Sequence, residues 1–187
     1  MARDEKEVYG LALIGRLTQA EIMHGRDGKE DVIKKMISKG YDGPIHITDI
    51  AKEKKYPLSY HILFLESYME LYGPESFDML SQKAPMMEEV MGWFDKLTKK
   101  PERIISKVED YWEKFFDFGR VEGKTIRYNE GVITGYEVCT RTPLFCRAIT
   151  HYFEGVCAVI DVEAKCEHTR CQLKNNYYSE WHIAWKK

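Results

Sequence analysis

The sequence predicts an α+β fold with a helical N-terminal half and an antiparallel sheet of about four strands. Apolar residues recur every three or four positions as far as Phe118, which indicates helices. Beyond Gly119, Val, Ile, Thr and Tyr alternate with polar residues, which indicates strands. The order is helices, hairpin, helix, hairpin, so neighbouring strands are antiparallel and a helical layer packs on one side of the sheet.

The size of the chain indicates one hydrophobic core. It has 187 residues, 44% of them hydrophobic and 13% aromatic, which suffices for one substantial domain. We therefore predict a single domain over 1–187, with a helical part at 1–100 and a helix-hairpin-helix-hairpin part at 101–187.

Glycines divide the first half into helices. An apolar stripe that begins at Val8 ends at Gly25, and a second stripe over 29–39 ends at Gly40.

Pro57 then precedes a strongly apolar helix over 58–72, which Gly73 ends. Aromatic and aliphatic side chains cover more than one face of this helix, so it is either core or the wall of a ligand cavity. Further helices are expected at 76–82, 86–97 and 102–116.

Four segments of the second half are predicted strands. The runs 120–128 and 132–140 form one hairpin, and 162–173 and 177–185 form the other. Between the hairpins, Thr142-Pro143 begins a helix that runs to about Val159.

The charge and the composition exclude several classes. The formal net charge is −2, from 28 basic and 30 acidic residues, so no basic excess favours nucleic acid as a partner. The longest apolar runs, such as 11–14, are far too short for a membrane span, and the charged N-terminus is unlike a secretory signal. Five cysteines without framework spacing indicate reduced thiols in a cytoplasmic protein.

Soft metal ligands gather near the C-terminus. Four of the five cysteines and three of the six histidines fall between Pro143 and Trp185. Thiolates and imidazoles placed on ordered elements are what a zinc site or a reactive-thiol site requires.

The same region resembles the 4-vinyl-reductase-like family of predicted hydrocarbon- or small-molecule-binding domains. The matching residues are Thr142-Pro-Leu-Phe-Cys146, His151-Tyr-Phe-Glu-Gly155 and His168-x2-Cys171-x7-Ser179 with the apolar end to Trp185. This family includes sensor regions of phenol-responsive activators and is related to subunits of TRAPP vesicle-tethering complexes. The resemblance covers roughly 102–187 and implies a ligand-binding fold that forms a homodimer.

The phenol sensors bind zinc through three cysteines and a glutamate. Carried over by position, this implies a structural zinc site with Cys146, His168 and Cys171 as ligands, His168 standing for the glutamate. Ser179 stands for the remaining cysteine and is a poor zinc ligand. Because His168 and Cys171 are an odd number of residues apart, they meet only if the strand bulges.

Ordinary packing also explains several of these cysteines. Cys146 and Cys157 fall on one apolar helix stripe, where cysteine acts as a small hydrophobe. Cys139, at a strand end, is expected to pack rather than to bind a metal.

The leading functional hypothesis is a small-molecule-binding sensory module with an apolar cavity for a hydrophobic or aromatic ligand. No catalytic motif is present, which favours a module over an enzyme. The alternatives are an assembly or scaffold protein with a buried lipid-like ligand, and a metal- or thiol-dependent enzyme. The candidate lining residues are Tyr60, Phe64, Tyr68, Met91, Phe94, Trp112 and Phe116.

Overall fold

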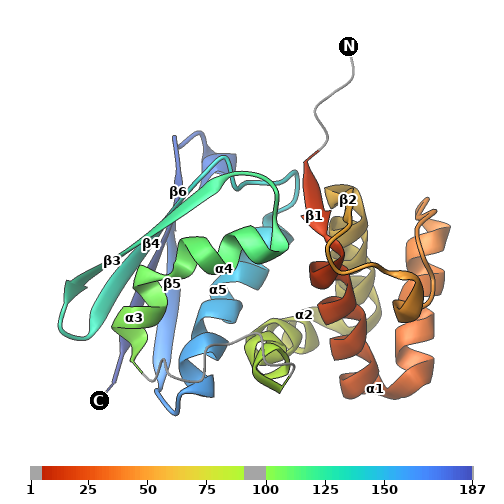
Figure 1. Ribbon diagram of the computed structural model, residues 1–187, viewed down its shortest axis with the longest axis horizontal. Coiled ribbons are helices and arrows are strands. Elements are labelled where there is room, and N and C mark those ends of the chain that lie inside the picture. Colours follow the sequence, from red (N-terminus) through yellow and green to blue (C-terminus); the bar gives the residue numbers. More distant parts are fainter. Residues whose placement is uncertain (1–5, 91–99, 187) are drawn as a thin grey trace. The chain divides into compact units, whose positions relative to one another are not determined.

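A computed structural model describes residues 6–90 and 100–186 of the chain (Figure 1). The chain divides into two compact units. Unit 1 comprises Met1–Leu80 and Lys114–Phe118, and unit 2 comprises Ser81–Glu113 and Gly119–Lys187. The division falls within a helix, α2 (Leu58–Val90), rather than at residue 100. The predicted helix at 86–97 lies mostly outside the described residues.

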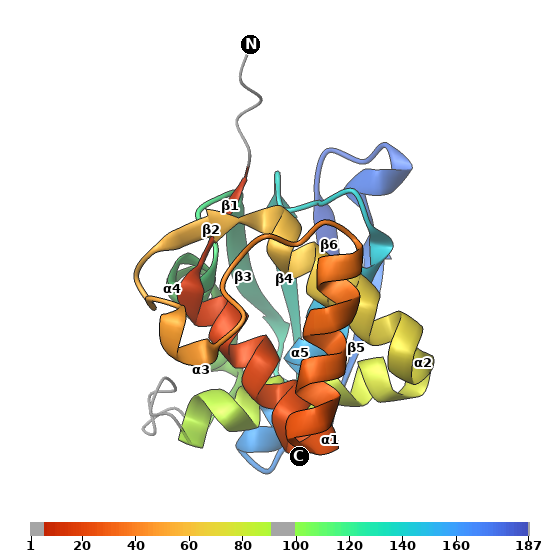
Figure 2. The same cartoon turned by 90° about the vertical axis from the view of Figure 1, so that its right-hand side faces the viewer.

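Unit 1 contains one long helix and the first part of another, and each of them bends at a glycine. Helix α1 (Gly10–Ser38) has Gly25 at φ 74°, and α2 has Gly73 at φ 76°. L-residues with a side chain rarely adopt such values, so the helical path is interrupted where the sequence predicted helix ends. Figure 2 shows the two arms of α1 that result.

A small two-stranded sheet in unit 1 was not predicted. Strands β1 (Glu7–Tyr9) and β2 (Lys55–Pro57) pair antiparallel, and Val8 also bridges to Phe116. The prediction that Val8 belongs to the first helix was wrong. A three-residue strand is too short to show alternation, and the Val8 side chain is fully buried either way.

Unit 2 contains the predicted four-stranded sheet. The strands are β3 (Arg120–Arg127), β4 (Glu130–Tyr136), β5 (Ala164–Arg170) and β6 (Ser179–Trp185). They run in the order β3-β4-β6-β5, and every neighbouring pair is antiparallel. Alternate residues of β6 are buried, as a strand with one face on a core requires. The predicted α+β class is confirmed.

Helices α3 (Pro101–Ser106) and α5 (Pro143–Val159) lie against one face of this sheet (Figure 1). The Thr142 side chain accepts a hydrogen bond from the Leu144 N–H, which confirms the predicted start of α5. The single helix predicted over 102–116 is instead two helices, α3 and α4 (Val108–Phe115), separated at Lys107. None of the described helices has the length and apolar character that crossing a membrane requires.

Candidate thiol cluster

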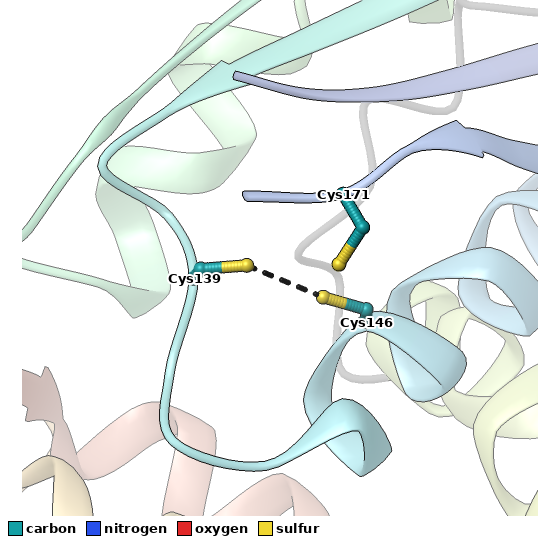
Figure 3. A group of neighbouring side chains, drawn as sticks. All are labelled: Cys139, Cys146 and Cys171. Atoms are coloured by element: carbon teal, nitrogen blue, oxygen red, sulfur yellow. Dashed lines mark hydrogen bonds between the residues drawn. The ribbon is translucent and has the colours of Figure 1, made fainter. Parts of the chain in front are cut away.

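Three cysteines that are distant in sequence meet in unit 2. Cys139 lies in the connection between β4 and α5, Cys146 in the first turn of α5, and Cys171 just after β5. Their sulfur atoms all lie within 4.8 Å of one another. Figure 3 shows the three side chains pointing toward one another.

The sulfur of Cys139 is the most heavily hydrogen-bonded of the three. It lies 3.7 Å from the Cys146 sulfur and 3.5 Å from the Ser179 hydroxyl oxygen. Ser179 is fully buried and accepts a hydrogen bond from the Gln172 N–H at 3.2 Å. Its own hydroxyl proton is therefore available to the Cys139 sulfur.

A 3-10 turn, η2 (Gln172–Lys174), contacts the cluster through Cys139. The Cys139 N–H donates to Oε1 of Gln172 at 3.3 Å, and the backbone N–H of Leu173 hydrogen-bonds the Cys139 sulfur. The turn thus fixes both the backbone and the side chain of Cys139.

These contacts separate the acidities of the two close thiols. The hydrogen bond from Cys146, with further ones from Ser179 and Leu173, lowers the pKa of Cys139 to about 5 although burial raises it. The pKa of Cys146 is raised, because its proton is held by Cys139 and its surroundings are buried. The opposite pKa shifts favour a negative charge on the Cys139 sulfur, with Cys146 as the protonated donor.

The predicted metal ligands are only partly brought together. Cys146 and Cys171 are neighbours, but His168 is not a member of the cluster. Strand β5 bulges between His168 and Arg170, as a meeting of His168 with Cys171 required. The His168 ring nevertheless stacks on Trp181, with centroids 4.8 Å apart.

Cys139 takes the place expected for His168. We predicted that Cys139 packs without a ligand-like role, because it stands alone at a strand end. The spacing of Cys139 from Cys146 could have predicted their contact. A strand end, a short connection and a capped helix follow one another here, and this order brings the two residues together.

The other two cysteines are core residues. Cys157 on α5 is 4% exposed and Cys166 on β5 is 5% exposed. Burial, with the charge of Glu154 nearby, raises the pKa of Cys157 to about 12, and burial raises the pKa of Cys166 as well.

The predicted ligand-lining residues are dispersed. Phe64 and Tyr68 stack on one another in the core of unit 1, where both are at most 1% exposed. In the same unit, Tyr60 donates a hydrogen bond to Asp42, and Phe116 packs edge-on against His61.

Trp112 packs against Phe145 in unit 2, whereas Met91 and Phe94 lie outside the described residues. The lining set therefore stays a prediction.

Unit 2 encloses an apolar cavity of about 20 Å³ between its sheet and α3, α4 and α5. It is lined by residues that include Ile105, Val108, Ile133, Phe153 and Ile183. A ligand pocket typically has roughly 300–1,000 Å³, so this cavity has room for little more than a water molecule.

The chain matches no protein-family model and no curated protein. The solved structures that are similar to this chain are consistently H-NOX domains, that is, haem nitric oxide/oxygen-binding domains. The Fe(II) unliganded H-NOX protein from K. algicida has a TM-score of 0.66 at 10% identity, over 96% of this chain and 97% of that one.

An H-NOX protein from S. oneidensis in the Fe(II)NO ligation state has a TM-score of 0.62 at 12% identity, over 96% and 99% of the two chains. A variant of Tt H-NOX has a TM-score of 0.69 at 11% identity, over 96% and 95%. At this identity the likeness establishes the fold: the chain has the architecture of an H-NOX domain along nearly its whole length.

This finding corrects two expectations. The resemblance to the 4-vinyl-reductase-like family and TRAPP subunits was wrong, because the structures that match the whole chain are H-NOX domains. The zinc ion implied by that resemblance was wrong with it, because the metal in the matching structures is Fe(II). The homodimer and the hydrocarbon ligand came from the same resemblance and have no support.

Proposed function

We propose that this chain is a small-molecule-binding sensory module. The observation that carries the proposal is the whole-chain match to H-NOX domains, over 96% of this chain. Those proteins are described by their Fe(II) and NO ligation states, and one of the structures concerns H-NOX activation. Because the chain has the architecture of these domains along nearly its whole length, its fold suits the binding of a small molecule and a response to it.

Haem is the cofactor that this fold family implies, so the histidines of this chain must be tested as axial ligands. His61, on α2, is 2% exposed, and burial together with the charge of Arg16 holds its pKa well below the ordinary value. A neutral imidazole is the form that binds iron. However, both ring nitrogens of His61 and Nε2 of His168 are buried and have almost no solvent-exposed surface.

The remaining histidines have other neighbours. His24 lies 2.8 Å from the Tyr68 hydroxyl, and its ring stacks on Tyr72. Nδ1 of His151 lies 3.0 Å from Glu154, and Nε2 of His182 lies 3.8 Å from Glu130. His46 lies in an exposed loop.

Neither the described residues of unit 1 nor those of unit 2, each unit taken by itself, fit a haem. The buried nitrogens of His61 and His168 have almost no accessible surface for a ligand, and the cavity of unit 2, at about 20 Å³, is far too small for a porphyrin. We therefore propose a sensory module that binds its small molecule directly.

Native mass spectrometry of the purified chain, with and without added haemin, tests the proposal. We expect a non-covalent adduct that is lost on denaturation, and no Soret band with haemin. A ligand that binds only the native state raises the Tm of the protein. The proposal would therefore be contradicted if the mass spectrum shows the chain without an adduct and no compound of a small-molecule library raises its Tm.

A stoichiometric haem complex would instead make haem the ligand. Two variants then locate the iron: His61→Leu should abolish the Soret band, and the matched control His46→Leu should retain it.

A further inference from the structure

We propose that Cys139 and Cys146 form a hydroperoxide-responsive disulfide pair, in which the Cys139 sulfur is attacked first and Cys146 resolves it. This inference rests on the thiol cluster alone. It is independent of whether the chain binds a small molecule elsewhere.

The separation of the two sulfur atoms suits this reaction. They are 3.7 Å apart, and a disulfide bond is about 2.05 Å long. Cys139 lies in the connection that follows Tyr136, the last residue of β4, and precedes Pro143, the first residue of α5. Closing a gap of roughly 1.7 Å therefore requires movement of an irregular segment, not of a strand or a helix.

Exposure and hydrogen bonding identify Cys139 as the sulfur that is attacked. Cys139 is half-buried, whereas Cys146 is 3% and Cys171 is 9% exposed. The Ser179 hydroxyl and the Leu173 N–H both hydrogen-bond the Cys139 sulfur. Donors that converge on a partly exposed sulfur stabilise the anion that reacts with peroxides.

The reaction balances in two steps. The Cys139 thiolate attacks one peroxide oxygen, so that an S–O bond forms and the O–O bond breaks. The sulfur loses two electrons to the peroxide, and the other oxygen leaves as water or an alcohol after taking a proton. The Cys146 sulfur then attacks the Cys139 sulfenic acid, the S–S bond forms, and the hydroxyl leaves as water with the Cys146 proton.

The first step also prepares the second. The hydrogen bond to Cys139, burial and the charge of a Cys139 thiolate all raise the pKa of Cys146. Sulfenic acid formation removes that charge, so the resolving thiol ionises more readily after Cys139 has been oxidised. The Cys171 carbonyl accepts a hydrogen bond from the Asn176 side chain at 2.9 Å, which holds the backbone of Cys171 in place.

The test is the oxidation of the reduced, chelator-treated full chain with hydrogen peroxide, followed by intact-mass measurement and peptide mapping. We expect the loss of two hydrogen atoms and a Cys139–Cys146 cross-linked peptide, both reversed by dithiothreitol. In Cys146→Ser, oxidation should stop at a Cys139 sulfenic acid that a cyclic 1,3-dione labels. In Cys139→Ser, both the disulfide and the label should be absent.

Cys157→Ala is the matched control, because Cys157 lies in the same helix as Cys146 but outside the cluster. It should form the disulfide as the unaltered chain does. Circular dichroism of each variant shows that its fold is retained.

Several outcomes would overturn the proposal. A disulfide between Cys139 and Cys171 would make Cys171 the resolving residue. If the cysteines of the chain are oxidised no faster than those of unfolded peptides, Cys139 and Cys146 are not a reactive pair. Protection from peroxide that only the chelator relieves would make the cluster a metal site instead.

Discussion

Cys139 and Cys157 belong to the same unit and have opposite chemistry. Cys157 lies on the buried face of α5, and burial raises its pKa to about 12. Cys139 receives hydrogen bonds from Cys146, Ser179 and Leu173, and its pKa falls to about 5 although burial acts on it too.

In Cys139 the hydrogen-bond donors outweigh the effect of burial on the thiol pKa. Burial favours the neutral thiol because a charge loses its hydration. Donors aimed at the sulfur replace that hydration and reverse the direction of the shift. Both the donors within reach and the greater exposure of its side chain therefore make Cys139, and not Cys157, the reactive cysteine.

The largest expected effect comes from removing a large side chain from the core of unit 2, the unit that holds both cysteines. Trp181 is 1% exposed, meets Phe153 edge-on and donates from its indole nitrogen to Thr150 at 3.2 Å. Trp181→Ala should lower the free energy of unfolding by about 3–5 kcal/mol, measured by urea titration. The difference in alkylation rate between the two cysteines should then narrow, because a less stable unit opens more often and exposes Cys157.

Trp181→Phe is the control for that experiment. It keeps an aromatic ring and loses the indole hydrogen bond, so a clearly smaller loss is expected. A loss below about 1 kcal/mol for Trp181→Ala would show that this ring is not central to the core.

The second prediction measures the comparison directly. At pH 7, iodoacetamide should alkylate Cys139 at least about a hundred times faster than Cys157, because a thiolate reacts and a buried thiol does not. Peptide mass spectrometry over a time course gives both rates in one sample. Equal rates would mean that local opening, and not the environment of the folded state, controls access.

The third prediction removes one donor. Ser179→Ala takes the hydroxyl from the Cys139 sulfur and leaves the Gln172 N–H without its acceptor. The pKa of Cys139 should rise, so its pH profile of alkylation moves to higher pH, and stability should fall by about 1–3 kcal/mol.

Ser81→Ala is the matched control. The Ser81 hydroxyl is buried and makes no hydrogen bond among the described residues, so its loss should leave the alkylation profile in place. A profile that stays unchanged in Ser179→Ala would mean that Cys146 and Leu173 alone stabilise the thiolate.

The smallest expected effect concerns a buried base, the His61 imidazole of unit 1. Burial raises the pKa of a thiol but lowers that of an imidazole, and the pKa of His61 is well below 6.5. Above pH 6.5 both the folded and the unfolded state carry a neutral ring. Below it the unfolded state binds a proton that the folded state rejects, so stability falls by at most about 1.4 kcal/mol per pH unit.

Chemical unfolding of the unaltered chain and of His61→Phe between pH 7 and pH 5 checks this sign. The variant should lose that part of the pH dependence, and the exposed-loop control His46→Gln should keep it. A pH dependence that persists in His61→Phe would assign it to other groups.

The sequence by itself determined the class of fold. The change from helical to alternating apolar spacing after Phe118, the Thr142-Pro143 start of α5 and the glycines at positions 25 and 73 are local signals, and each appears in the structure. Such signals depend on neighbouring residues only. The three-residue strands β1 and β2 lacked them, because their pairing is made between residues far apart in the chain.

The tertiary structure alone decided the candidate site. Cys146 and Cys171 were expected to lie close together, and they do, but the His168 ring stacks on Trp181 and stays outside the cluster although β5 bulges after it. The connection after β4 brought Cys139 there instead. Whether a cysteine is a core residue or a thiolate depends on hydrogen-bond donors that come from other segments of the chain. The spacing of the cysteines along the chain therefore identified candidates for the site but could not predict which of them is the thiolate.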